Sequence, residues 1–403
     1  MASVTILACT VLLAACTLPI SPISLPPPGA PGIVRVVPGS VHKVCQLVGE
    51  ADFERAVPTG NRTASRSGLY GTDLGIPVEY GGRLTMLFGD SVALGNTSTR
   101  TWQEDAVGYS TDASADDCVD LTFPTAADGW FDYATIPGVS LQGLEVPTGA
   151  FAAHGFLFAF YTTDSNVSAG TMGRSVLAVS EQGTPRFRKV LDVSSDRFIN
   201  VSPVPVRNAD LPGLPSNTGD GVLLFGSGAW RKSPMSLAWA PLDRLADKAS
   251  WRWFAGVDGS GTPRWAETEA GATDLFGPPC LGELQVTWQP ALGRFVLLDS
   301  CDTPRGIHLA SAPRPWGPWS DHLTVFDPWA DGGYCHFMHA VQDPPCDTVN
   351  DPFRAGDWGG EYGAYLIDRY TRVEPGGDLT VFFTMSTWNP YTVELMTARL
   401  RLS

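Results

Sequence analysis

Short apolar segments separated by turn residues recur along most of this 403-residue chain. In the stretch from Thr72 to Asp90, TDLGIPVEYGGRLTMLFGD, two apolar runs flank a Gly-Gly pair. A two-residue glycine turn between such runs is a strong hairpin signal. Apolar residues with helical spacing rarely extend beyond two turns, and the best such stretch, 241–248, is short. The pattern therefore predicts an all-β protein.

The strand–turn–strand pattern returns in four further copies, which begin at Glu145, Asn200, Gly282 and Gly360. A third strand follows every copy: AVGYSTD from Ala106, SVLAVSE from Ser175, MSLAWAP from Met235, GIHLASAP from Gly306 and YTVELMTARL from Tyr391. One small sheet cannot bury both of its faces, whereas radial stacking of neighbouring units does so. We therefore predict a five-bladed β-propeller as a single domain over residues 41–403. A large β-sandwich is the alternative, but it would not explain five matched units.

The first 16 residues, MASVTILACTVLLAAC, form an apolar run that is too short to span a bilayer and is typical of a signal segment. Its end, Leu-Ala-Ala-Cys16, resembles a bacterial lipobox, in which Cys16 would become the lipidated first residue. No Lys or Arg precedes the run, so an ordinary signal peptide cut nearby stays an alternative. Residues 17–40 are rich in Pro and Ser and are expected to form an extended tether. We expect an exported protein, held by lipid on the outer face of the membrane or otherwise secreted.

The formal net charge of −15 excludes a basic surface for nucleic acid and is compatible with a neutral or cationic ligand. No glycine pattern for phosphate or dinucleotide binding is present, and neither is a serine-hydrolase motif. We therefore expect no cofactor, no nucleic-acid partner, and a monomer that contacts the membrane only through a lipid anchor.

Six cysteines follow Cys16, and an even count in an exported chain favours disulfides. Proximity in sequence favours Cys280–Cys301 and Cys335–Cys346, which leaves Cys45–Cys118. Six cysteines allow 15 connectivities, so this pairing is one of several. No Cys/His spacing typical of zinc sites is present, and we expect no metal.

Two aspartates mark the outer ends of the first hairpin. A Gly81-Gly82 turn pairs Tyr80 with Arg83 and, by the same register, Asp73 with Asp90, so that their Cβ atoms would lie about 4.5–5.5 Å apart. Pro77 could introduce a bulge that shifts this register by one residue. Opposed like charges destabilise a sheet, but in a pocket they drive two pKa values apart, as glycoside hydrolysis requires. The alternative is that the aspartates cap turns.

Other units carry acids at related positions. A His154-Gly155 turn would place Glu145 opposite Asp164, and the 290–293 loop would place Glu283 opposite Ser300. Because the innermost strands of a propeller start at one face, these acids should converge at one channel mouth. There they would bind substrate hydroxyls, tune a pKa or hold a cation.

Aromatic side chains that could stack on sugar rings are expected on the same face. The substrate-binding candidates are Trp102, Trp230, Tyr362, Trp388 and Asn389, together with the acids Glu145, Asp164 and Glu283. For any single tryptophan, packing in the core is the alternative.

Several of these pieces together resemble the domain-of-unknown-function family 4185. They are GTDLGIPVEYGGRLTMLFGDS, EVPTGAF, GELQVTW, PWGPWS, EYGAYL and STWNPYTVELM. Members of that family are regarded as endo-D-arabinanases that act on the D-arabinan of mycobacterial-type cell walls. The resemblance implies a five-bladed propeller with catalytic aspartates in Thr-Asp-Leu-Gly and Phe-Gly-Asp, which are Asp73 and Asp90 here. Where the family usually has Thr after Phe-Gly-Asp, this chain has Ser91.

The resulting hypothesis is a glycoside hydrolase that cleaves internal D-arabinofuranosyl linkages of arabinogalactan or lipoarabinomannan. A glycan-binding propeller without activity and a glycosidase of another specificity are the alternatives.

Overall fold

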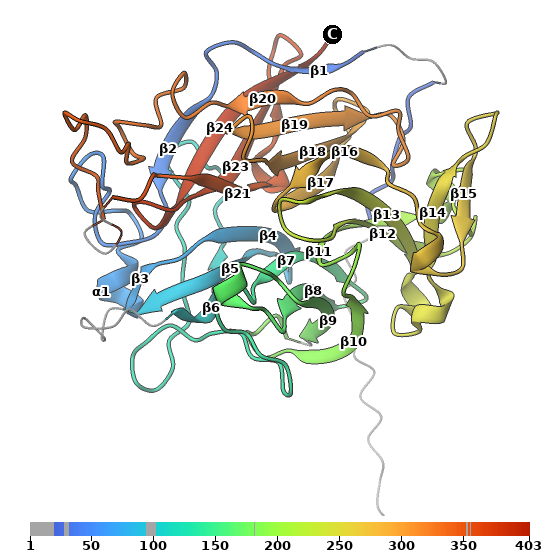
Figure 1. The fold of residues 1–403 in the computed structure, drawn as a ribbon, viewed down its shortest axis with the longest axis horizontal. Helices are drawn as coiled ribbons and strands as arrows, with labels where there is room; N and C mark the ends of the chain where they lie inside the picture. Colours follow the sequence, from blue (N-terminus) through green and yellow to red (C-terminus); the bar gives the residue numbers. More distant parts are fainter. Residues whose placement is uncertain (1–19, 28–31, 94–101, 181, 352–353, 355) are drawn as a thin grey trace, which may run out of the picture.

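Five antiparallel sheets surround a central axis in the computed structural model, which describes residues 20–27, 32–93, 102–180, 182–351, 354 and 356–403 (Figure 1). This confirms the predicted five-bladed β-propeller. The first sheet contains β3 (Leu69–Gly71), β4 (Leu74–Tyr80), β5 (Arg83–Ala93) and β6 (Trp102–Ser110). The second contains β7 (Pro147–Ala153), β8 (Phe156–Thr163), β9 (Arg174–Ser180) and β10 (Arg188–Ser194).

The remaining blades follow in sequence order. The third contains β11 (Asn200–Arg207), β12 (Asp220–Ser227), β13 (Ser233–Pro241), β14 (Arg252–Val257), β15 (Pro263–Ala266) and β16 (Phe276–Leu281). The fourth contains β17 (Leu284–Gln289), β18 (Arg294–Ser300), β19 (Ile307–Ala312) and β20 (Leu323–Phe326). The fifth contains β21 (Glu361–Leu366), β22 (Arg372–Val373), β23 (Leu379–Thr387) and β24 (Thr392–Leu402), joined by β1 (Val34–Val36) and β2 (His42–Gln46).

In the part of the chain that the structure describes, helical structure is confined to short turns between strands. The α-helix α1 spans Thr63–Ser67, and the short 3-10 turns are Val167–Ala169, Asn208–Asp210, Leu242–Arg244, Lys248–Ser250, Glu269–Gly271 and Asp368–Tyr370. The 241–248 stretch with helical spacing thus contains the turn Leu242–Arg244 and the first residue of the turn Lys248–Ser250. No helix among the described residues is long and apolar enough to cross a bilayer.

The blades are held together by five apolar clusters, one between each pair of neighbours. They join Leu87 to Tyr161, Phe160 to Leu224, Phe225 to Phe295, Leu298 to Met385, and Phe88 to Phe382. Each sheet therefore buries both faces, which is the physical reason why a single unit could not stand alone. The innermost strands β4, β7, β11, β17 and β21 contact one another around the axis and line the central channel.

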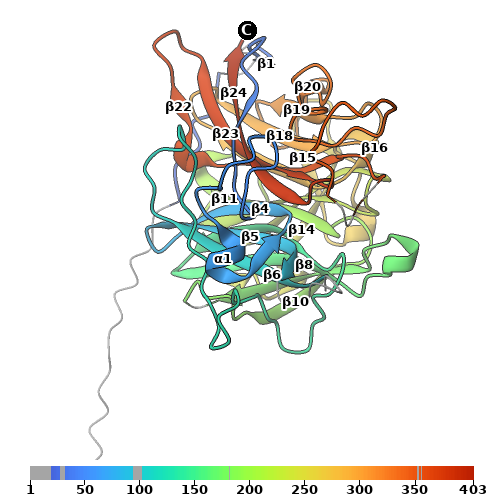
Figure 2. The same cartoon turned by 90° about the vertical axis from the view of Figure 1, so that its left-hand side faces the viewer.

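The ring is closed by the two ends of the chain. β1 and β2 both pair with β24, and the backbone N–H of Ile33 donates to the carbonyl of Ser403 at 2.9 Å (Figures 1 and 2). Earlier residues also pack on the propeller, since Ile23 is buried and its N–H donates to Asp210 Oδ2 at 3.1 Å. Part of the stretch expected as a tether is therefore integrated into the fold.

Three disulfides are formed: Cys280–Cys301 and Cys335–Cys346, which proximity favoured, and Cys45–Cys118, the pair that these two leave. The last ties β2 of the fifth blade to the segment after β6 of the first, so it reinforces the ring closure. Disulfides persist in oxidising compartments, which is consistent with export. Cys16 lies outside the described residues.

Candidate active site

A cavity of about 490 Å³ opens at the channel mouth where the innermost strands begin. Asp73 and Asp90 lie in its wall beside Glu283, Glu361 and Tyr391. Four blades place an acid at or just before the start of the innermost strand: Asp73 before β4, Glu145 before β7, Glu283 before β17 and Glu361 in β21. The third blade has Asn200 at this position. Of these four acids, Asp73, Glu283 and Glu361 line the cavity, and Glu361 was not among the candidates from the sequence.

The register of the first hairpin is the predicted one from Tyr80 to Ile76, and it then shifts by one residue. The bulge lies at Leu74 and Gly75, whose φ angles are 66° and 80°. Glycine adopts this left-handed region without strain, whereas Pro77 stays within the regular ladder. As a result Asp73 faces Gly89, whose N–H donates to the Asp73 carbonyl at 3.1 Å. The direct opposition of Asp73 and Asp90 is therefore wrong, but both side chains reach the same cavity.

Asp73 is buried, and the groups that stabilise its charge are neutral tyrosine hydroxyls, chiefly that of Tyr362. The Tyr362 hydroxyl donates to Asp73 Oδ2 at 3.0 Å, and Oδ1 has no hydrogen-bond partner among the described residues. Burial and then the charge of Asp90 raise the pKa of Asp73 well above its usual value, while the Tyr362 hydrogen bond acts in the opposite direction. Such a carboxyl keeps its proton at higher pH than an ordinary aspartate does.

Asp90 is surrounded differently. Its Oδ2 accepts the backbone N–H of Leu144 at 3.1 Å, and the Tyr391 hydroxyl donates to its main-chain carbonyl at 2.8 Å. Burial raises the pKa of Asp90, whereas the backbone N–H groups of Leu144 and Gly143 lower it. Main-chain donors stabilise the ionised form, so of the two aspartates Asp90 is better suited to carry a negative charge.

A third aspartate lies behind the pair. Asp105 of β6 is opposite Asp90 of β5, is only 1% exposed, and has an Oδ2 atom without a hydrogen-bond partner among the described residues. Burial, followed by the charges of Asp90 and Asp73, raises the pKa of Asp105 well above its usual value. In the sequence Asp105 directly follows Glu104 and precedes the apolar part of the third strand, so nothing singled it out.

The second blade does not repeat the predicted acid pair. Its register follows the His154-Gly155 turn as far as Gly149 and then shifts by one residue. Glu145 is buried, and its carboxylate accepts the N–H groups of Gln142 and Ser165, so it holds two loops. Asp164 is exposed and forms an ion pair with Arg174, away from the cavity. The prediction that Asp164 contacts substrate is therefore not supported by its position.

The fourth blade follows the predicted register throughout. Ser300 Oγ lies 3.4 Å from Glu283 Oε2, and the indole N–H of Trp230 donates to Glu283 Oε1 at 2.9 Å. Trp230 is half-buried and lines the cavity, with the Arg231 guanidinium 4.3 Å from its ring centre. Glu283 and Trp230 thus form one wall.

Two arginines partly balance the acids of the cavity. Arg231 pairs with Asp302, and Arg305 Nε lies 3.3 Å from Glu361 Oε1, which also accepts the N–H of Gly306. Neither arginine stands out in the sequence, because each follows a turn and its partner comes from another segment.

The remaining candidates differ in their roles. Trp388 lines the cavity and donates its indole N–H to Asp357 Oδ2 at 3.2 Å. Asn389 is fully buried and bonds to Asn350, Asp351 and the carbonyls of Arg354 and Asp357, so it fixes a loop rather than facing substrate. The Trp102 side chain lies outside the described residues.

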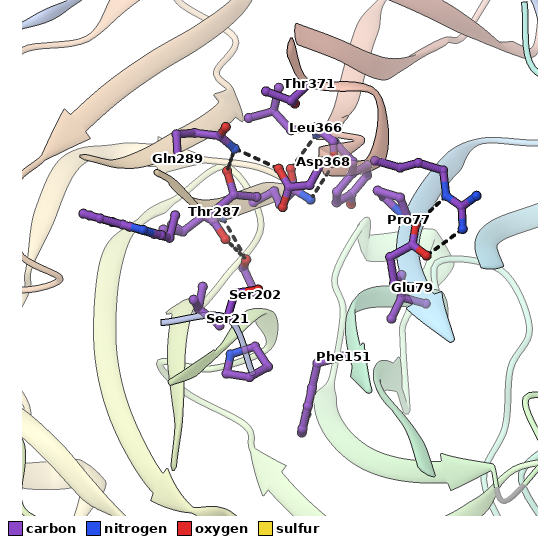
Figure 3. A pocket seen from close by; sticks show the side chains of 18 of the residues that line it. Ser21, Pro77, Glu79, Phe151, Ser202, Thr287, Gln289, Leu366, Asp368 and Thr371 are labelled. Carbon is purple, nitrogen blue, oxygen red and sulfur yellow. Dashed lines mark hydrogen bonds and ion pairs between the residues drawn. The ribbon is translucent and has the colours of Figure 1, made fainter. Parts of the chain in front are cut away.

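The opposite mouth of the channel holds a larger cavity, of about 620 Å³ (Figure 3). Its walls are the far ends of the innermost strands, with Ile20 and Ser21 at its edge. Its main acid, Asp368, accepts a hydrogen bond from Gln289 at 2.8 Å, and Glu79 is paired with Arg369. Desolvation by the surrounding protein raises the pKa of Asp368 to about 6, against the hydrogen bond from Gln289. Because Glu79, the other carboxyl of this cavity, is neutralised by its ion pair with Arg369, the smaller cavity is the better candidate for acid–base chemistry.

Within the described residues, potential metal ligands gather at Cys335, Cys346 and Asp347, whose ligand atoms lie within 4.8 Å of one another. The two sulfurs form a disulfide, so they are not available as thiolates.

The model of the family described as "Domain of unknown function (DUF4185)" matches residues 59–397. No curated protein sequence matches the chain. Solved structures with a similar fold include an exo-β-1,3-galactanase from Phanerochaete chrysosporium, with 9% identity over 89% of this chain and a TM-score of 0.44. The match spans 64% of that galactanase. An endo-arabinase from Bacteroides thetaiotaomicron has 13% identity over 81% of this chain and 93% of its own, with a TM-score of 0.39. Likeness at this level concerns the fold and does not identify a substrate.

Proposed function

The chain belongs to the DUF4185 family, and from the chemistry of its cavity we propose that it is a glycoside hydrolase with Asp73 and Asp90 as its catalytic pair. One observation carries the proposal: two aspartates share one cavity wall, yet their surroundings differ. Asp73 is held by a tyrosine hydroxyl and Asp90 by main-chain N–H groups. Carboxyl pairs with separated pKa values are what glycosidic bond cleavage requires.

In this mechanism Asp73 is the general acid. Its raised pKa keeps a proton available for the oxygen of the leaving sugar. Asp90, ionised, would either attack the anomeric carbon or take a proton from the attacking water. The nearby acids Glu283 and Glu361 would accept hydrogen bonds from sugar hydroxyls, and the rings of Trp230 and Trp388 would pack on sugar faces.

The proposed substrate is the arabinan of the cell wall, cleaved at internal D-arabinofuranosyl linkages. Family membership supports this choice, and so does the acidic character of the cavity, which disfavours anionic polysaccharides. The three disulfides support an extracytosolic location. A lipid at Cys16 would hold the enzyme at the outer face of the membrane, close to this polymer.

The test is to incubate the protein with arabinogalactan and measure the release of oligoarabinosides. Wild-type protein should release them, and Asp73→Asn and Asp90→Asn should each lose at least about 10³-fold in kcat. Asp368→Asn is the matched control, because it changes a carboxyl in the same way at the opposite mouth of the same channel and should retain activity. No release by wild-type protein, with retained binding, would instead indicate a glycan-binding propeller. Release from another polysaccharide only would indicate a different specificity.

A further inference from the structure

An aromatic surface extends from the rim of the candidate active site to the outside of the molecule. We name Trp329, Tyr334 and Trp358 the aromatic shelf. The ring centres of Trp329 and Tyr334 lie 4.8 Å apart, those of Tyr334 and Trp358 5.2 Å, and those of Trp329 and Trp358 6.3 Å. Trp358 lines the cavity, whereas Trp329 does not.

The shelf exposes costly apolar surface. Trp329 is 56% exposed and Trp358 41%. Among the described residues, only these two and Trp388, at 38%, are tryptophans with such exposure. Trp358 and Trp388 line the cavity, and Trp329 lies beside Trp358. Trp388 is tied to the segment of Trp358 because its indole N–H donates to Asp357, the preceding residue. Exposed aromatic rings gathered at one site, rather than scattered, mark a binding surface.

The segments that present these rings are fixed in place. The 327–334 turn is held by Asp327 Oδ1, which accepts the N–H of Trp329 at 2.8 Å, and the Cys335–Cys346 disulfide follows directly. On the other segment, the N–H of Gly359 donates to His339 O at 2.7 Å, and Gly359 O accepts the N–H of Trp388 at 2.7 Å. The rings are therefore pre-organised, so binding costs little ordering entropy.

We propose that the aromatic shelf is a subsite for sugar residues of the same neutral polysaccharide chain, outside the cavity that holds the cleaved bond. This rests on the proposed function and extends it to the length of substrate that the protein engages. Continuity with the cavity identifies the occupant, because a polymer bound at Trp358 continues naturally onto Trp329. Flat exposed indoles match the apolar faces of sugar rings, and the net charge of −15 disfavours an anionic chain.

The experiment measures binding in an Asp90→Asn background, which prevents degradation of the ligand. The probes are arabinogalactan, galactan and mannan as polymers, and short oligoarabinosides that fill only the cavity. Trp329→Ala should raise the Kd for the bound polymer about tenfold, as expected for the loss of one stacked aromatic face, and leave the Kd for short oligosaccharides unchanged. Trp329→Phe should recover much of the affinity. Phe156→Ala, which removes an exposed ring at the far end of the second blade, is the control and should change neither value.

Two results would overturn the shelf: an unchanged polymer Kd in Trp329→Ala, or equal weakening for polymers and short oligosaccharides. Failure to bind any of the three polymers would also overturn it. The hydrolase proposal is judged separately, by product release from the protein with an intact Asp90. Release with an unchanged Kd in Trp329→Ala therefore removes only the shelf, whereas binding without release removes only the hydrolase.

Discussion

Removing the Tyr362 hydroxyl should identify which aspartate is the acid. This hydroxyl donates to Asp73 Oδ2 at 3.0 Å and lowers the pKa of Asp73, against the larger effect of burial. In Tyr362→Phe the carboxylate loses a donor, so its pKa should rise further. A hydrogen bond to a charged group contributes about 1.5–3 kcal/mol, and one pKa unit corresponds to about 1.4 kcal/mol. Because the protonated acid also accepts this bond, the difference between the two forms is smaller, and we expect a rise of about 1 unit.

The assay is the pH dependence of kcat/KM on arabinogalactan. The alkaline limb of such a profile reports the group that must be protonated, and the acidic limb reports the group that must be ionised. If Asp73 is the general acid, Tyr362→Phe shifts the alkaline limb upward by about 1 unit and leaves the acidic limb in place. Tyr80→Phe, which removes a hydroxyl at the other end of the same hairpin, should move neither limb.

An upward shift of the acidic limb alone would refute the assignment and make Asp73 the base. A profile that does not move in Tyr362→Phe would show that the hydrogen bond does not influence the titration of Asp73. The experiment therefore tests the roles of the pair without removing either carboxyl.

Further predictions concern packing and buried charge. Gly89→Ala would place a Cβ atom 2.3 Å from Asp73 Oδ1, so we expect kcat to fall about 10²-fold while the protein stays folded. The control Gly259→Ala, which has open space around the new Cβ atom, should leave kcat unchanged. Normal activity in Gly89→Ala would contradict this geometry. The pKa of Asp105 is raised in the folded protein, so the protein loses stability as the pH rises and this buried carboxyl ionises. Asp105→Asn should therefore melt about 1–3 °C higher than wild type at pH 8 and at the same temperature as wild type below pH 4. A lower melting temperature of Asp105→Asn at pH 8 would show that the charged form of Asp105 stabilises the fold. The Lys43 side chain is 4% exposed, and its Nζ lies within 3.4 Å of carboxylate oxygens of Asp52, Glu54 and Glu394. Lys43→Met should therefore lower the free energy of unfolding, measured with denaturant, by about 3–5 kcal/mol. A decrease below about 1 kcal/mol would refute this prediction.

The blade count could be predicted because it depends on a repeated local pattern. Every unit shows two apolar runs, a turn and a third run, and stacking is the one arrangement that buries both faces of each sheet. The closure of the ring could not be predicted in the same way. β1 and β2 pair with β24, which lies more than 300 residues later, and nothing in the composition of a short strand names so distant a partner.

The hairpin register shows where sequence reasoning reaches its limit. The Gly81-Gly82 turn set the pairing correctly as far as Ile76, because each ladder pair follows from the one before. Pro77 drew attention as the residue that could disturb the ladder, since it lacks an N–H. The bulge instead uses Gly75, and Leu74 beside it is also at positive φ. The bulge accompanies the burial of Leu74 and the position of Asp73 in the cavity wall, which are tertiary features.

The same limit separates the four acids at the channel mouth. They occupy corresponding positions in four blades, so the sequence pattern treats them alike, and their chemistry is set by partners from distant segments. Glu145 accepts two main-chain N–H groups, Glu283 is held by Trp230 and Ser300, and Glu361 is paired with Arg305. Asp73 is held by tyrosine hydroxyls, chiefly that of Tyr362, and has a like charge nearby. Because burial and poor stabilisation of the charged form raise a carboxyl pKa, Asp73 is the acid suited to donate a proton.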